Sequence, residues 1–307
     1  MLDVRRLAVL REVARQGSFS RAADALGYTQ PAISRQVAIL ERETGAVLVE
    51  RRPAGVRLTD AGQLLVSHAE AVLGRLQDAE VELNALLGME AGRLRMSTLT
   101  SAAATIMPLA ISEYRKRLPG VELSVSMVDP AGILPLLRSG EVDLALCNDP
   151  SHAELSDIES IHLFDEPMLI ALPKDHPLAG RDCLTLKQLA GERWMLGTTT
   201  SCPDADRFLR SCHAADVEPD IAFHNDDYTA ILGFVAAGVG VAPVPEMVTR
   251  AAPRSVRILP LGPEPLTRPI LASLPAGYRP GPAAAMIEVL REVSGRWTKP
   301  SRQLRAA

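Results

Sequence analysis

Residue types that commonly carry out chemistry are present in this chain, but their spacing forms no recognisable catalytic or metal site. The four cysteines show no Cys-x-x-Cys spacing, and no two of the six histidines stand four residues apart as on a zinc-binding helix. The segment Gly238-Val-Gly240 lacks the third glycine of a dinucleotide-binding turn, and neither a Gly-x-Ser-x-Gly elbow nor a phosphate-binding loop occurs. We therefore expect no enzymatic activity, no metal and no cofactor.

Length and composition describe a globular protein of about two domains. The 307 residues are 47% hydrophobic and 23% charged, with 37 acidic against 33 basic side chains. Apolar runs fall short of the roughly 18 residues of a membrane helix, and no signal peptide is visible. We therefore expect a cytoplasmic protein without a membrane partner.

Positive charge is concentrated at the start of the chain, where residues 1–60 hold ten arginines and seven acids. Three helices are expected over residues 4–45, the third beginning after Thr29 as its N-cap, with Pro31 in its first turn. At 100° per residue, Ile33, Val37 and Leu40 share the inward face of this third helix. Residues 47–50 and 56–59 then predict a hairpin, so the segment predicts a winged helix-turn-helix.

The opposite face of the third helix is small, polar and cationic, as a helix entering the major groove of DNA requires. Arginines at the hairpin tip are suited to phosphate or the minor groove. The alternative is an ordinary three-helix cluster with a solvated arginine face. The candidate DNA-binding residues are Gln30, Pro31, Ser34, Arg35, Arg42, Arg51 and Arg52.

Residues 2–62 closely resemble the N-terminal domain of LysR-type transcriptional regulators. The resemblance lies in Gly17-Ser-Phe-Ser-Arg-Ala-Ala23, Thr29-Gln-Pro-Ala-Ile-Ser-Arg-Gln36, Leu40-Glu41, Arg51-Arg52 and Leu58-Thr-Asp-Ala-Gly62. It implies base contacts from Gln30, Pro31, Ser34 and Arg35, and a backbone or minor-groove contact from Arg52. Two positions depart: Val49 stands where the family usually has Phe, and Tyr28 occupies a variable turn position.

A proline-free stretch predicts a long helix over residues 60–88. Apolar residues recur in it at alternating spacings of four and three, which is the seam of a dimerising coiled coil. The alternative is an amphipathic helix packed on its own domain. The seam residues are Leu65, Ala69, Val72, Leu76, Ala79, Leu83 and Leu86.

Strand-like and helix-like segments alternate from residue 92 onward, which argues for a parallel α/β sheet divided between two lobes. The expected elements include one helix over residues 102–117 and a half-buried strand over residues 121–127. The resemblance implies a periplasmic-binding-protein-like effector domain with two Rossmann-like lobes. We expect domains over residues 1–59 (DNA-binding), 60–88 (linker helix) and 89–307 (effector-binding). Lobe 1 would comprise about 89–164 and 267–298, and lobe 2 about 165–266.

Ser/Thr-rich loops before two body helices offer N–H donors and hydroxyls for a ligand, possibly a carboxylate, in the cleft between the lobes. The alternative is that these loops are plain helix caps. No arginine that would clamp a carboxylate is evident from the sequence. The candidate effector-binding residues are Thr100, Ser101, Asp129, Cys147, Thr198, Thr200, Ser201 and Asp226.

Cys202 and Cys212 lie where peroxide-sensing members of the family carry a reactive pair, but their surroundings match that motif poorly, so we expect reduced thiols. The chain is interpreted as a ligand-responsive regulator of a dyad-symmetric promoter site. Its expected partners are double-stranded DNA, a small-molecule effector, a second copy through residues 60–88, a homotetramer and RNA polymerase. A solute-binding protein and an α/β enzyme are the alternatives; the absence of a signal peptide and of a catalytic constellation opposes them.

Overall fold

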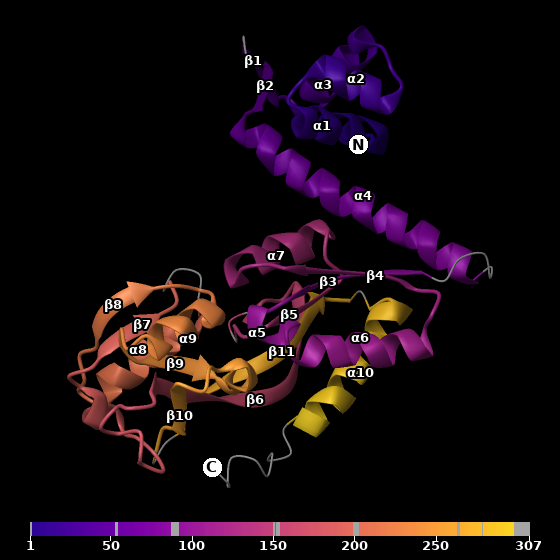
Figure 1. The fold of residues 1–307 in the computed structure, drawn as a ribbon. Helices are drawn as coiled ribbons and strands as arrows, with labels where there is room; N and C mark the ends of the chain where they lie inside the picture. Colours follow the sequence, from indigo (N-terminus) through magenta and orange to yellow (C-terminus); the bar gives the residue numbers. More distant parts are fainter. Residues whose placement is uncertain are drawn as a thin grey trace. The chain divides into compact units, whose positions relative to one another are not determined.

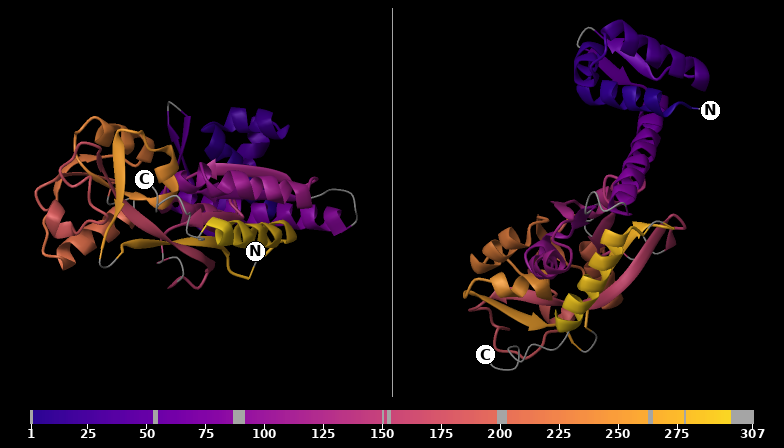
Figure 2. Two further views of the ribbon diagram at one scale, coloured as in Figure 1. Left: turned by 60° about the horizontal axis from the view of Figure 1, so that its bottom comes forward. Right: turned by 90° about the vertical axis from the view of Figure 1, so that its right-hand side faces the viewer.

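The computed structural model describes residues 2–52, 55–86, 92–149, 151, 154–198, 203–262, 265–277 and 279–297. The chain divides into two compact units (Figures 1 and 2). The first comprises Met1–Gly92 and takes in Pro135–Val142; the second comprises Arg93–Leu134 and Asp143–Ala307. We call residues 2–58 the head and residues 93–297 the body. No helix in the described ranges combines the length and apolar character needed to cross a membrane.

The head is a three-helix cluster followed by a two-stranded hairpin, which confirms the winged helix-turn-helix prediction. Its helices are α1 (Val4–Gln16), α2 (Phe19–Leu26) and α3 (Gln30–Thr44). Strands β1 (Val49–Arg52) and β2 (Gly55–Leu58) pair antiparallel. One apolar core joins all of these elements, and its fully buried members include Leu10, Val13, Ala22, Ile33, Val37, Leu40 and Leu48.

The turn between α1 and α2 is tied to the hairpin by a close backbone contact. Gly17 ends α1 with φ +60°, and its carbonyl accepts a hydrogen bond from the Val56 N–H at 2.9 Å. A Cβ added to Gly55, at φ +130°, would lie 2.5 Å from the same carbonyl oxygen, so only glycine fits there. Ser18 caps α2, which therefore begins at Phe19.

The long helix α4 (Asp60–Leu86) has 27 residues and changes character along its length. Val66 and Ala69 are buried against the head core. Further along, Val72, Leu76 and Leu83 are 40%, 48% and 57% exposed. The first part of the helix thus packs on its own domain, whereas the later seam positions remain exposed in the single chain.

The body is built on a mixed sheet in the strand order β10-β6-β11-β5-β3-β4, with β9 also paired to β6. Strands β3 (Arg93–Thr98), β4 (Glu122–Met127) and β5 (Leu144–Cys147) are parallel, as the alternating pattern predicted. The expectation of a wholly parallel sheet is wrong, however, because β6 (Ile158–Pro173) and β11 (Thr267–Pro275) run antiparallel (Figure 1). These strands carry the chain out of one lobe and back again, so they must run in opposite directions.

Strand β6 belongs to both lobes. Residues 158–167 pair with β11, whereas residues 168–173 pair with β9 (Ala242–Pro245) and β10 (Val256–Pro260). In lobe 1, α6 (Ile106–Arg117) and α10 (Gly281–Trp297) share one core with β3, β5 and β11. In lobe 2, Ile170 and Leu172 of β6 point into one core and Leu169 and Ala171 into another. Alternation along one strand therefore buries both of its faces.

Lobe 2 completes its two cores with short elements. These are the 3-10 helices η2 (Leu186–Leu189) and η3 (Glu246–Ala251), the parallel strand pair β7 (Arg193–Leu196) and β8 (Asp220–His224), and helices α8 (Pro203–Ala214) and α9 (Tyr228–Ala236). Trp194 of β7 lies at the centre, fully buried, with its ring centroid 4.6 Å from that of Phe208.

Two local predictions for lobe 1 need correction. The expected single helix over residues 102–117 is two helices, α5 (Thr100–Ala103) and α6, separated at Ala104–Thr105. Pro108 explains the break, because its ring clashes with a helical carbonyl four residues back and fits best in a first turn. Strand β4 is an edge strand in which Val125 and Met127 are exposed, not half-buried.

Candidate functional site

Helix α3 separates an apolar face from a polar, cationic one. Ile33, Val37 and Leu40 are buried, as predicted. Thr29 occupies the N-cap position, but its side chain makes no capping hydrogen bond. Pro31 removes one of the two N–H groups that a cap can bond, and the Thr29 hydroxyl does not accept from the other.

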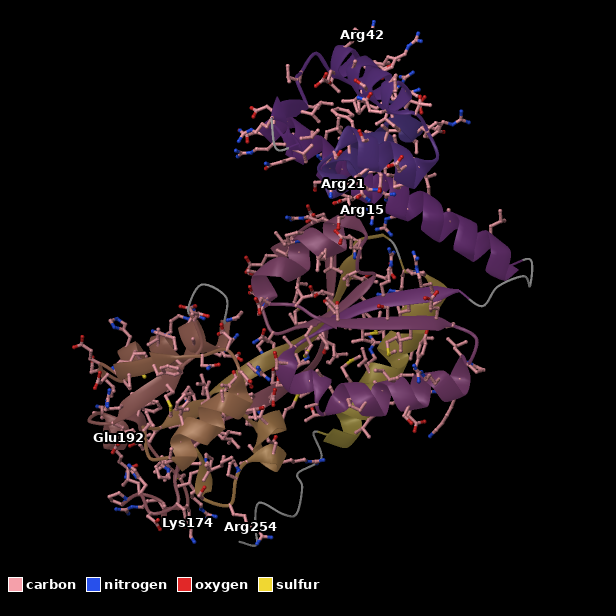
Figure 3. The ribbon with its side chains drawn as sticks, turned by 45° about the horizontal axis from the view of Figure 1, so that its top comes forward. Arg15, Arg21, Arg42, Lys174, Glu192 and Arg254 are labelled. Carbon is pink, nitrogen blue, oxygen red and sulfur yellow. The ribbon has the colours of Figure 1, made fainter. Side chains whose placement is uncertain are left out.

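The outward face of α3 carries the residues that the sequence analysis singled out. Gln30, Pro31, Arg35 and Arg42 are exposed, and Ser34 is partly exposed. Figure 3 shows Arg42 pointing away from the head near the C-terminal end of α3. This face therefore offers amide, hydroxyl and guanidinium donors side by side.

The hairpin is held to α3 by the Glu41 carboxylate, which accepts hydrogen bonds from the backbone N–H groups of Leu48 at 2.9 Å and Val49 at 3.3 Å. Val49 is partly buried against the head core despite being smaller than phenylalanine. Glu41 therefore fixes where the hairpin begins relative to α3.

Of the two hairpin arginines, Arg52 is described in full, and the side chain of Arg51 lies outside the described residues. Arg52 donates from Nη2 to Glu50 at 2.9 Å, and both side chains are about half exposed. Such surface pairs contribute about 0–1 kcal/mol, so a phosphate can compete for Arg52.

In the body, the first turn of α5 lines a polar cavity of about 60 Å³. Thr100 and Ser101 come from α5, Asp129 precedes α7 (Pro130–Ser139), and Asp226 follows β8. The described lining also includes Asn148, Asp204, Tyr228 and Arg268.

Arg268 of β11 is the centre of a buried ion cluster on this cavity. It is 2% exposed and donates from Nε to Glu166 at 2.8 Å, from Nη1 to Asp204 at 2.5 Å and from Nη2 to the Ser101 hydroxyl at 2.7 Å. Burial opposes its charge, but Asp204 and then Glu166 outweigh burial and raise the pKa of Arg268. One guanidinium thus joins α5, β6 and α8.

The two carboxylates of the cluster have further partners. Asp204 accepts from Asn148 Nδ2 at 2.8 Å and from the Tyr228 hydroxyl at 3.0 Å. Glu166 accepts from the Met247 N–H at 2.6 Å, and its burial raises the pKa of this carboxyl despite Arg268. Asn148 is itself 3% exposed, and its Oδ1 has no hydrogen-bond partner in the described part of the chain. The cavity wall therefore contains an acceptor that a ligand donor could satisfy.

A larger cavity of about 500 Å³ lies on α5 as well. Thr100, Ser101 and Tyr228 line both cavities. Its other lining residues are mostly apolar, including Pro108 and Leu232. The first turn of α5 is thus the element common to both spaces.

The predicted effector residues fall into three groups. Thr100, Ser101, Asp129 and Asp226 line the polar cavity together. Thr198 lies beside them, donating to Asp226 from its N–H at 2.8 Å and from its hydroxyl. Thr200 and Ser201 lie outside the described residues.

Cys147 is not brought to the cavity. It is fully buried in the sheet, with its sulfur 3.2 Å from the Ser273 hydroxyl oxygen, and burial raises the pKa of its thiol to about 11. Burial likewise raises the pKa of Cys212 to about 11, which keeps that sulfur a thiol at neutral pH. Cys202 lies outside the described residues.

The sequence analysis missed the cluster residues Glu166, Asp204, Asn148 and Arg268. No arginine clamp was evident from the sequence; the structure places Arg268 on the cavity, already paired with Glu166 and Asp204. A signal was available for Arg268, because the strand in which it stands, β11, is otherwise largely apolar. A charged residue in such a strand must meet an opposite charge.

Comparisons with known proteins indicate the same protein family for both units. Residues 4–63 match the model of the bacterial regulatory helix-turn-helix protein, lysR family, and residues 88–295 match the LysR substrate binding domain. The probable HTH-type transcriptional regulator LrrA of Synechococcus elongatus is 32% identical over 295 residues, which cover 95% of this chain and 98% of that protein. The DNA-binding transcriptional dual regulator OxyR of Escherichia coli is 30% identical over 80% of each chain. Full-length CbnR complexed with its target DNA superposes with a TM-score of 0.71 at 23% identity, covering 95% of this chain and 100% of that one.

Proposed function

The chain belongs to the LysR family of DNA-binding transcriptional regulators, and we propose that it binds a dyad-symmetric promoter site as a dimer and responds to a small molecule in the cavity at α5. Its relatives are transcriptional regulators. We assign it no catalytic activity and place its action in the cytoplasm, where promoter DNA and RNA polymerase are found.

The observation that carries the DNA-binding proposal is the outward face of α3. Arg35 is exposed beside Ser34 and one turn from Pro31, whose small ring allows close approach to a groove. An arginine that donates two hydrogen bonds to guanine is worth about 1–3 kcal/mol of discrimination between bases. We assign base reading to Gln30, Pro31, Ser34 and Arg35, and phosphate or minor-groove contacts to Arg42, Arg51 and Arg52.

The exposed seam of α4 supports the proposed dimer. Val72, Leu76 and Leu83 repeat at heptad-like spacing and would lose water contact against a second copy of the helix. We further propose a tetramer with its second interface on the body, where Val125 and Met127 are exposed on the edge strand β4.

The charge of the polar cavity argues against the carboxylate that the sequence suggested. Asp129, Asp204 and Asp226 line it, and the only arginine in its described lining, Arg268, is already engaged by two carboxylates. The buried Asn148 oxygen adds an acceptor. We therefore propose that the effector presents N–H or O–H donors and is neutral or cationic.

A competition gel shift tests the DNA-binding proposal. The full chain is titrated onto the DNA flanking its own gene, with random DNA of equal length as competitor. Arg35→Ala should lose about tenfold or more of the preference for the site over random DNA. A variant that keeps the wild-type preference would show that α3 does not read the bases through Arg35.

A further inference from the structure

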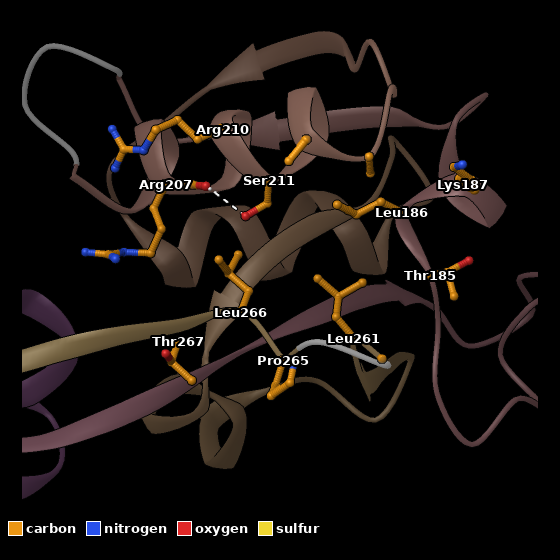
Figure 4. Close-up of a pocket in the computed structure, with 13 residues that line it drawn as sticks. Thr185, Leu186, Lys187, Arg207, Arg210, Ser211, Leu261, Pro265, Leu266 and Thr267 are labelled. Carbon is orange, nitrogen blue, oxygen red and sulfur yellow. Dashed lines mark hydrogen bonds between the residues drawn. The ribbon is translucent and has the colours of Figure 1, made fainter.

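Lobe 2 contains a third cavity, of about 710 Å³, which we call the lobe 2 pocket (Figure 4). It is bounded by η2, by α8 and by the chain around Leu261 and Leu266. Its volume lies within the range of about 300–1,000 Å³ that small organic ligands occupy in proteins. The lobe 2 pocket shares no lining residue with either cavity at α5.

The polar lining of the lobe 2 pocket is cationic. Lys187 of η2 and Arg207 and Arg210 of α8 line it, and no acidic residue does so in the described part of the chain. Arg210 pairs with Asp206 one turn away, but both side chains are more than half exposed. Since exposed pairs of this kind are worth about 0–1 kcal/mol, the pair does not neutralise the lining.

One N–H group of Arg207 lacks a hydrogen-bond acceptor in the described part of the chain. This group is the Nε, which is buried. The Arg207 carbonyl accepts a hydrogen bond from the Ser211 hydroxyl at 3.1 Å, drawn as the dashed line in Figure 4. A buried donor left unpaired is costly, and an anionic oxygen is the strongest partner that it can find.

The rest of the lining is apolar. Leu186 of η2 lines the lobe 2 pocket at one end. Leu261 and Leu266 line it across from α8 (Figure 4). A wholly hydrophilic anion such as phosphate would leave these side chains without a partner. A ligand that combines an anionic head with an apolar body satisfies both parts of the lining.

We propose that the lobe 2 pocket binds an amphipathic organic acid, with its head at Arg207 and Arg210, which lie at the same end of the pocket (Figure 4), and its apolar body on Leu261 and Leu266. Helix α8 and the chain that leads into β11 line this pocket and also carry Asp204 and Arg268 of the buried ion cluster. Arg207 lies one helical turn after Asp204 on α8, and Leu266 lies two residues before Arg268. An occupant of this pocket therefore contacts both elements that hold the Arg268–Asp204 pair.

Calorimetric titration of the full chain with 2-naphthoate tests the proposal. This probe has an aromatic body and a carboxylate head, and 2-naphthylmethylamine is its matched cationic control. We expect one naphthoate to bind per chain and the amine to give no saturable binding. The double variant Arg207→Gln/Arg210→Gln should bind naphthoate about tenfold more weakly or worse, because it loses two charge-assisted hydrogen bonds.

A second double variant controls for the loss of net charge. Lys174→Gln/Arg254→Gln removes the same two charges from exposed positions of lobe 2 that do not line the pocket (Figure 3). It should bind naphthoate as the wild type does. The proposal is overturned if the wild type binds no naphthoate, if the amine binds equally well, or if the two double variants lose affinity equally.

Discussion

Replacing Arg268 with methionine should destabilise the body strongly, because it leaves two carboxylates buried without their cation. Arg268 is 2% exposed, and its partners Glu166 and Asp204 have side chains that are 0% and 5% exposed. Removing one partner of a buried ion pair typically costs about 3–5 kcal/mol, and here two pairs and the bond to Ser101 are lost together. We therefore expect a loss of at least about 3 kcal/mol in the free energy of unfolding.

Urea unfolding monitored by tryptophan fluorescence measures this loss. Both tryptophans, Trp194 and Trp297, belong to the body, so the signal reports on that unit alone. The triple variant Arg268→Met/Glu166→Gln/Asp204→Asn removes the unpaired charges and should regain part of the loss. An Arg268→Met midpoint within experimental error of wild type, or a triple variant no better than the single one, would refute the buried-cluster argument.

The pH dependence of Arg268→Met follows from the same burial. In the folded variant, desolvation raises the pKa of Glu166 above its unfolded value, in the direction already found for the wild type. Between the two pKa values the folded state holds a proton that the unfolded state has released. Stability therefore falls as pH rises, by up to about 1.4 kcal/mol per pH unit for each proton. The deficit of the variant should be smaller at about pH 5 than at about pH 8.

Three further variants test the other parts of the molecule. Leu76→Asp places a charge on the α4 seam and should yield a smaller species in sedimentation, with weaker binding to full-length sites; an unchanged sedimentation coefficient would contradict the seam. Glu41→Ala removes the acceptor of two backbone N–H groups and should lower head stability by about 1.5–3 kcal/mol in thermal unfolding; no change would show that the hairpin is held otherwise. Thr100→Val should unfold like wild type yet lose the response of the footprint to a donor-bearing effector found by thermal-shift screening; a wild-type response would place the effector elsewhere. Ser101 is a poorer choice for that test because its hydroxyl belongs to the ion cluster.

The head was predictable because its structure follows from local pattern. The spacing of Ile33, Val37 and Leu40 alone fixes which face of α3 is buried, and Gly17 ends α1 through a backbone conformation that few other residues adopt.

The body was predictable only in part because its decisive contacts are distant in sequence. The residue pattern of β6 does not determine its orientation in the sheet, and its antiparallel partner lies about a hundred residues away in β11. The hydrogen bond between Arg268 and Ser101 spans 167 residues of sequence, and that between Arg268 and Asp204 spans 64. No pattern of neighbouring residues can therefore predict these contacts. Thr100 and Ser101 were found because a helix start has a sequence signature, whereas a buried charge such as Arg268 does not indicate which distant residues pair with it.

A footprint of the full chain on the DNA flanking its own gene tests the central claim most directly. A dimer that places one α3 in each of two major grooves should protect two half-sites of inverted sequence on one face of the duplex. Their centres should lie about one helical turn, or a multiple of it, apart. We expect this paired protection for the wild type and its loss for Arg35→Ala at equal protein concentration. Uniform protection without a dyad, or an unchanged footprint for Arg35→Ala, would contradict it.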